Sequence, residues 1–276
     1  MQFDDIAEKT LREFAGRRDP SWIERLRSWR HGFWFGVSRR VRWSRGMHRE
    51  KPAGELPNLS PEEIERVSAL RSRYQIAFER TLGRRSSKIN YEYLDILDRA
   101  WEHSGHRPPR GGLVCDVGCA SFWYAAALQA FFRPQRLIGV EIEGHRLFWD
   151  GHARIDYAAG YVADVPNAEF VVADYATFRL PAETITAWFP FVTSAAILAW
   201  RLPLSLLQPE SLFTSVKHNL KADGLFVMIN HGTREAQRAA DCCVAAGLKS
   251  LDCWQYSGAL GSYRSAPPVL SWWRHA

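Results

Sequence analysis

The sequence lacks the patterns that identify a membrane-spanning or exported protein. Its 276 residues contain no run of about 18 apolar residues, so we expect no transmembrane helix. The first ten residues carry Asp4, Asp5 and Glu8 and lack the apolar core of a signal peptide, so we do not expect secretion. These absences predict a cytoplasmic protein.

The five cysteines do not form the pattern of a disulfide framework or a zinc site. Their number is odd and no two of them have CxxC spacing; they are Cys115, Cys119, Cys242, Cys243 and Cys253. Cys242 and Cys243 are adjacent in a predicted helix and cannot chelate from one face, so we interpret them as core residues. We expect no metal and a reducing compartment.

The positive charge is concentrated near the N-terminus. The chain has a net charge of +6, but residues 17–51 contain eleven Lys/Arg against three acidic residues, a net charge of +8. The remainder is therefore slightly acidic, and the basic character belongs to the N-terminal region alone.

Residues 1–87 are predicted to form a helical region. Asp4–Gly16 is a short amphipathic stretch, and Asp19-Pro20-Ser21 is a helix start. Apolar residues then recur every three or four positions, the helical period, at Trp22, Leu26, Trp29, Phe33, Val37 and Val41. After a linker at residues 51–57, Ser60 and Glu63 form a capping box for another helix.

Residues 88–276 are predicted to form an α/β domain. A helix is expected over Asn90–His103, and after Gly112 short apolar runs alternate with helical or loop stretches. This alternation is typical of a parallel sheet covered on both faces. The expected strands are Leu113–Val117, Arg136–Ile142, Phe170–Ala173, Thr186–Thr193, Leu225–Asn230, Leu251–Tyr256 and Val269–Trp273.

Acidic and small residues stand at the ends of the first three strands. Asp116 and Gly118 lie where the first strand turns into a helix, and such a turn offers backbone N–H groups to a polar ligand. Glu141 ends the second strand, where a carboxylate can accept hydrogen bonds from both hydroxyls of a ribose. Asp174 follows the third strand and can accept from an adenine amino group. We interpret the three tips as an adenosine-binding edge.

The order of these residues resembles the first three motifs of the class I S-adenosylmethionine (SAM) dependent methyltransferases. The residues that carry the resemblance are Asp116-x-Gly118, Glu141 and Asp174. The segment Lys221–Val227 is similar to the turn that precedes their fifth strand. The resemblance implies a Rossmann-like seven-stranded sheet of order 3-2-1-4-5-7-6 with the last strand antiparallel, and SAM as the cofactor. It also implies a set of cofactor-binding residues: Asp116, Gly118, Ala120, Glu141, Asp174, Tyr175 and, from the preceding helix, Tyr91. The sequence departs from the family at Ala120 and Phe122, which replace its second and third loop glycines.

The methyl acceptor is less well defined by the sequence. The Asn/Asp-Pro-Pro-aromatic motif of amide and base N-methyltransferases is missing, and Trp188–Ser194 stands in its place. His231, after the fifth strand, is a candidate general base for a hydroxyl. We expect a methyltransferase that acts on an apolar or aromatic small molecule. An RNA methyltransferase and a catalytically inactive SAM-like binding module remain alternatives.

The basic, Trp-rich segment has three interpretations. Its arginines and aromatic residues could bind RNA, or they could hold a helix at the surface of a membrane. The interpretation that we favour is a lid, whose aromatic stripe packs on the α/β domain and shapes the substrate pocket. The oligomeric state is not predicted.

Overall fold

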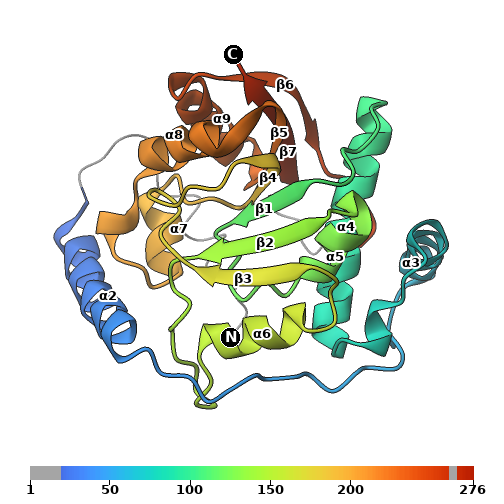
Figure 1. Cartoon of the computed structure of the whole chain (residues 1–276), viewed down its shortest axis with the longest axis horizontal. Coiled ribbons are helices and arrows are strands. Elements are labelled where there is room, and N and C mark those ends of the chain that lie inside the picture. The colour runs from blue at the N-terminus through green and yellow to red at the C-terminus, as the bar shows by residue number, and fades with distance from the viewer. Residues whose placement is uncertain (1–19, 261–265) are drawn as a thin grey trace.

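The computed structural model describes residues 20–260 and 266–276, and a seven-stranded sheet forms its centre (Figure 1). The strand order is β3-β2-β1-β4-β5-β7-β6, and β7 is antiparallel to both of its neighbours. This is the predicted order. The strands are β1 (Leu113–Val117), β2 (Arg136–Glu141), β3 (Ala168–Val172), β4 (Ala182–Trp188), β5 (Leu220–His231), β6 (Leu248–Gln255) and β7 (Pro268–His275).

Helices cover both faces of the sheet, as the apolar strands require. Residues of β5 alternate between two cores: Val227 and Ile229 face one, Phe226 and Met228 the other. The first core is closed by α4 (Arg84–Ser104) and α5 (Ala125–Phe132), and the second by α8 (Pro209–Asn219) and α9 (Gly232–Ala245). The remaining helices are α2 (Trp22–Val41), α3 (Pro61–Tyr74), α6 (Arg154–Val162), α7 (Ser194–Ala199) and the 3-10 turns η1 (Phe78–Arg80) and η2 (Leu204–Leu206).

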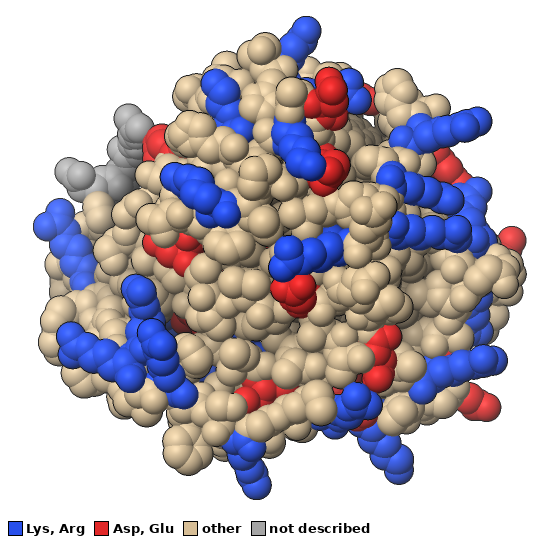
Figure 2. All heavy atoms as spheres, in the orientation of Figure 1, with Lys and Arg blue, Asp and Glu red and all other residues tan. Residues whose placement is uncertain are grey.

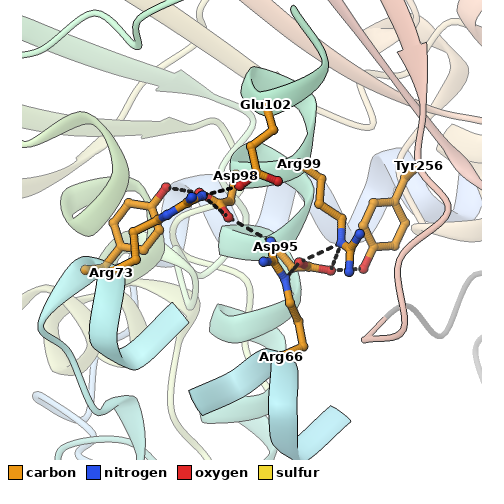
Figure 3. A network of polar contacts seen from close by, with 8 residues as sticks. Arg66, Arg73, Asp95, Asp98, Arg99, Glu102 and Tyr256 are labelled. Carbon is orange, nitrogen blue, oxygen red and sulfur yellow. Dashed lines mark hydrogen bonds and ion pairs between the residues drawn. The ribbon is translucent and has the colours of Figure 1, made fainter. Parts of the chain in front are cut away.

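A network of ion pairs and hydrogen bonds joins α4 to α3 and to Tyr256, which follows β6 (Figure 3). Asp95 and Asp98 of α4 are almost fully buried. Arg66 of α3 pairs with both, at 2.7 Å from Asp98, and Arg73 reaches Asp98 at the same distance. The hydroxyl of Tyr256 donates to Asp95. Burial of these carboxylates is tolerated because each has several cationic or hydroxyl partners.

The N-terminal segment lies along the outside of the α/β domain. α2 is at its edge, and residues 42–60, which we term the connecting segment, run past α6 to α3 (Figure 1). His48 N donates to Asp156 O at 2.9 Å where the segment crosses α6. A Cβ at Gly160 would lie 1.8 Å from His48 O, so this crossing requires glycine.

Some predicted boundaries differ from the structure. The fourth strand was expected at Thr186–Thr193, but β4 is Ala182–Trp188. Phe189 has φ of +56° and Pro190 has no N–H, so the chain leaves the sheet there. The helix expected from Asn90 begins at Arg84, and the proposed domain boundary after residue 87 falls within its first turn. The amphipathic stretch Asp4–Gly16 and the start at Asp19 lie outside the described residues.

Within the part of the chain that the structure describes, no helix combines the length and apolar character that crossing a bilayer requires.

Candidate active site

The loop between β1 and α5 has an unusual backbone. Gly118, Ala120 and Phe122 all adopt left-handed conformations, with φ of +69°, +51° and +56°. An L-residue pays about 1–2 kcal/mol for this conformation, which glycine adopts freely. These three residues occupy the positions of the three loop glycines in the motif of the class I SAM-dependent methyltransferases, which the sequence resembles. The loop therefore holds two non-glycine residues, Ala120 and Phe122, in a conformation that glycine adopts more easily.

Phe122 is accommodated below the loop. Its side chain is fully buried, and a Cβ on Gly139 of β2 would lie 2.6 Å from its Cδ1 atom. The ring also makes an edge contact with Tyr124, with centroids 5.9 Å apart. Phe122 thus occupies the space that a glycine leaves on the neighbouring strand.

A cavity of about 220 Å³ opens at the carboxyl ends of β1 to β5, beside this loop. Parallel strands bring their carboxyl ends to one edge, where α/β proteins bind ligands. Of the residues predicted to form the site, the lining contains Gly118, Ala120, Glu141, Asp174, Tyr175 and His231. Among the described residues that line the cavity, neither Asp116 nor Tyr91 occurs.

Glu141 is held by several partners on one side of the cavity. Its two carboxylate oxygens accept from Ala120 N and Glu143 N, each at 2.9 Å. Arg154 Nη1 lies 3.3 Å from Glu141, and its Nη2 lies 3.2 Å from Glu143. All three side chains are buried, and burial raises the pKa of the Glu143 carboxyl. Arg154 begins α6, and no motif in the sequence singles it out.

Asp116 lies behind the cavity wall. Its carboxylate accepts from the hydroxyls of Tyr124, at 2.6 Å, and Thr186. Complete burial raises its pKa to about 7 although both hydrogen bonds favour the charged form. Asp116 therefore ties β1 to β4 and to the start of α5, and the residues that follow it reach the cavity.

Stacked aromatic rings form another wall. Tyr93 of α4 stacks on Trp188 at the end of β4 and on Tyr124, with centroids 4.0 and 4.4 Å apart. All three residues line the cavity. Tyr91 instead donates to Glu79 at 2.8 Å and packs on Phe78. Helical spacing explains the difference, because residues two positions apart face in different directions on α4.

The far end of the cavity is mainly apolar. The ring of Phe189 stacks on His231, with centroids 3.8 Å apart and planes 7° from parallel. Burial lowers the pKa of His231 to about 4, so its imidazole is neutral at pH 7. Further apolar lining comes from α8 and from the region between β4 and α8, with Pro190, Phe191, Ile197, Trp200, Leu202, Leu206 and Leu212.

A group of potential metal ligands lies outside the cavity. His48 of the connecting segment meets Asp150 and His152, with ligand atoms within 4.8 Å of one another. His152 Nδ1 lies 3.2 Å from Asp150. The sequence does not predict this group because His48 is far from the other two along the chain.

No family model matches the sequence, and no curated protein matches it. Solved structures do resemble it. A TehB-like SAM-dependent methyltransferase from Corynebacterium glutamicum is 17% identical, with a TM-score of 0.45 over 67% of this chain and 88% of that chain. A SAM-dependent methyltransferase from Aquifex aeolicus is 13% identical, with a TM-score of 0.47 over 64% and 88%. One from Clostridium acetobutylicum is 8% identical, with a TM-score of 0.47 over 77% and 99%.

The strand order and the direction of β7 are those that the resemblance to class I SAM-dependent methyltransferases implied. The chain has their fold.

Proposed function

We propose that the chain is a methyltransferase that binds SAM in this cavity and methylates an apolar or aromatic small molecule. The charge of the lining carries the proposal, because the lining contains three carboxyl groups and one guanidinium. The carboxyl groups are those of Glu141, Glu143 and Asp174, and the guanidinium is that of Arg154. A negative lining favours a ligand with cationic groups. SAM supplies a methyl group that is activated by a positively charged sulfonium.

Unpaired donors support a polar ligand here. Trp188 Nε1 and Arg154 Nε are buried, belong to lining residues and have no hydrogen-bond partner among the described residues. Leaving a buried donor unpaired costs about 1–3 kcal/mol, and ligands commonly satisfy such groups. The residues present therefore fit the cofactor.

Each part of the cavity has a proposed role. Glu141 would bind the ribose hydroxyls, since a carboxylate has more acceptor sites than its two backbone N–H partners use. Asp174 would accept from the adenine, with Tyr175 beside it. The backbone at Gly118 and Ala120 would contact the methionine end. The rings of Tyr93 and Trp188 would stabilise the positive charge by cation–π interaction.

The apolar end of the cavity would bind the methyl acceptor. Phe189 and Phe191 offer rings to an aromatic or aliphatic molecule, and positioning alone can supply much of the catalysis of an in-line displacement. His231 is the candidate base. A pKa near 4 makes it a weak base, so its neutral nitrogen would accept a hydrogen bond and orient the nucleophile.

Calorimetry with SAM and S-adenosylhomocysteine tests the proposal. We expect both to bind, and Glu141→Ala to weaken binding by about 1–3 kcal/mol through the loss of charge-assisted hydrogen bonds. Glu169→Ala, on the exposed side of β3, is the matched control and should bind like the wild type. Circular dichroism establishes that both variants are folded. The absence of binding to the folded wild type would refute the proposal.

A further inference from the structure

The outward face of α2 is apolar. Four apolar residues follow one another at helical spacing on this face: Trp22, Leu26, Trp29 and Phe33. All four side chains are exposed, that of Trp22 by 74% and that of Trp29 by 71%. Ile23, Trp34 and Val41 extend the same exposed surface. An apolar surface of this extent on a folded protein marks an interaction site.

The opposite face of α2 is the one that packs on the protein. His31 is its buried residue, with Nδ1 3.4 Å from Leu202 O, and Ser28 Oγ accepts from Leu204 N at 2.9 Å. A Cβ at Gly32 would lie 3.6 Å from Pro203. These contacts fix the rotation of the helix, so the aromatic stripe is directed away from the protein. The predicted packing of this stripe on the α/β domain is not observed.

A second element carries exposed apolar residues beside the end of α2. The β2–α6 loop presents Leu147 and a fully exposed Trp149. Trp43, which follows α2, donates from Nε1 to Gly151 O of this loop at 2.9 Å. Trp43 and Met47 are themselves more than half exposed. The exposed apolar surface thus continues from α2 through the connecting segment to the loop.

Arginines flank this surface. Between residues 20 and 51 there are nine Lys/Arg and two Glu. Those on or next to α2 are exposed, namely Arg25, Arg27, Arg30, Arg39, Arg40 and Arg42. Figure 2 shows cationic side chains gathered where Figure 1 places α2. Exposed tryptophan beside exposed arginine on one helix is the composition of helices that lie at a membrane surface.

We propose that α2, Trp43 and the tip of the β2–α6 loop form a docking surface for an anionic lipid bilayer. The aromatic rings would enter the headgroup region while the arginines contact anionic headgroups. This docking does not depend on the proposed methyl transfer.

The exposed residues favour a lipid bilayer over two other binding partners, a nucleic acid and a second copy of the chain. Leu26, Ile23 and Val41 have no ring on which a nucleic-acid base can stack, whereas each of them gains from burial in a bilayer. A second copy of the chain would bring two strongly cationic segments together, and their repulsion opposes that contact. An anionic surface has the complementary charge.

Co-sedimentation of the full chain with vesicles tests the proposal. We expect binding to vesicles of phosphatidylcholine mixed with phosphatidylglycerol, and much weaker binding to phosphatidylcholine alone. Salt at about 1 M should weaken the binding, because it shortens the Debye length to about 3 Å. Arg25→Gln should weaken it about fivefold, the equivalent of about 1 kcal/mol per cation at an anionic surface.

A triple variant separates docking from general adhesion. Replacing Trp22, Trp29 and Phe33 by serine should reduce vesicle binding at least tenfold. The matched control replaces three apolar residues that are similarly exposed on α3, α9 and β6, by Ile64→Ser, Val244→Ser and Leu251→Ser. This control should bind like the wild type, and thermal unfolding establishes that both variants are folded.

Four results would overturn the proposal. Three come from the binding assays: the absence of vesicle binding, equal loss of binding in both triple variants, and a fluorescent single-stranded RNA that binds through α2 while vesicles do not. Dimerisation that buries Trp29 and prevents vesicle binding, measured by light scattering, would overturn it as well.

Discussion

α2 and α4 are nearly equal in length, 20 and 21 residues, and both carry apolar residues at helical spacing. α4 buries thirteen of its residues between α3, α5 and the sheet, whereas α2, all of whose residues are described, buries His31 alone. The apolar stripe of α4 is part of a core, and the apolar stripe of α2 faces solvent.

The comparison shows that periodicity predicts a helix and its apolar face but not what covers that face. In α4, the covering elements are supplied by the chain itself. In α2, polar and small residues make the intramolecular contact, and the apolar face remains available to another surface.

The largest expected difference between the two helices concerns a matched pair of leucines. Leu94→Ala in α4, where the side chain is fully buried, should lower the free energy of unfolding by about 2–5 kcal/mol, because it removes apolar contacts and leaves a cavity. Leu26→Ala in α2, where the side chain is 58% exposed, should change it by less than about 0.5 kcal/mol. Urea denaturation measures both. Equal losses would mean that the face of α2 is covered in solution.

The sheet was predictable from the sequence because its signals are local. Most strands contain an apolar run, and Gly118, Glu141 and Asp174 were expected from their places at strand ends. The contacts of Arg154 and Tyr93 were not predictable. Arg154 reaches the site only because α6 begins beside β2, and the choice between Tyr91 and Tyr93 depends on the rotation of α4 against the sheet.

Phe122 illustrates the same limit within the glycine loop. Its sequence position suggests a conflict with the cofactor, because a large side chain replaces a glycine. In the structure the ring packs against Gly139, which lies on the neighbouring strand and leaves room for it. The packing of Phe122 against Gly139 depends on the register between β1 and β2. No single sequence motif predicts that register.

Charged residues also differ in burial between α2 and the helices that cover the sheet. The arginines of α2 are exposed, whereas Glu235 of α9 is buried. Burial raises the pKa of Glu235 from 4.5 to about 7. Between these two values Glu235 binds more protons in the folded state than in the unfolded state, so its contribution to stability is greatest at low pH and falls as pH rises towards 7. This group should therefore cost up to about 3 kcal/mol of unfolding free energy between pH 4.5 and pH 8.

Glu235→Gln, which cannot ionise, should remove this part of the pH dependence. Denaturation at several pH values, with the exposed Glu210→Gln of α8 as control, measures the change. An unchanged pH profile in Glu235→Gln would show that the carboxyl is hydrated in the folded protein.

The smallest expected effect concerns two equivalent helix caps. Ser21 and Glu24 form a capping box on α2, and Ser60 and Glu63 form the same box on α3. α3 is tied to α4 by Arg66, and Glu63 itself pairs with Lys88 of α4 at 3.1 Å. Ser60→Ala should therefore lower the global free energy of unfolding by about 1 kcal/mol.

Ser21→Ala should leave global unfolding almost unchanged, because α2 can lose its first turn without exposing the core. Hydrogen exchange would then increase at the N-terminus of α2, while denaturant unfolding stays within about 0.5 kcal/mol of the wild type. If anionic vesicles restore the lost protection in Ser21→Ala, the stability of α2 is coupled to the surface that it contacts. A global loss equal to that of Ser60→Ala would instead place α2 in the same cooperative unit as the α/β domain.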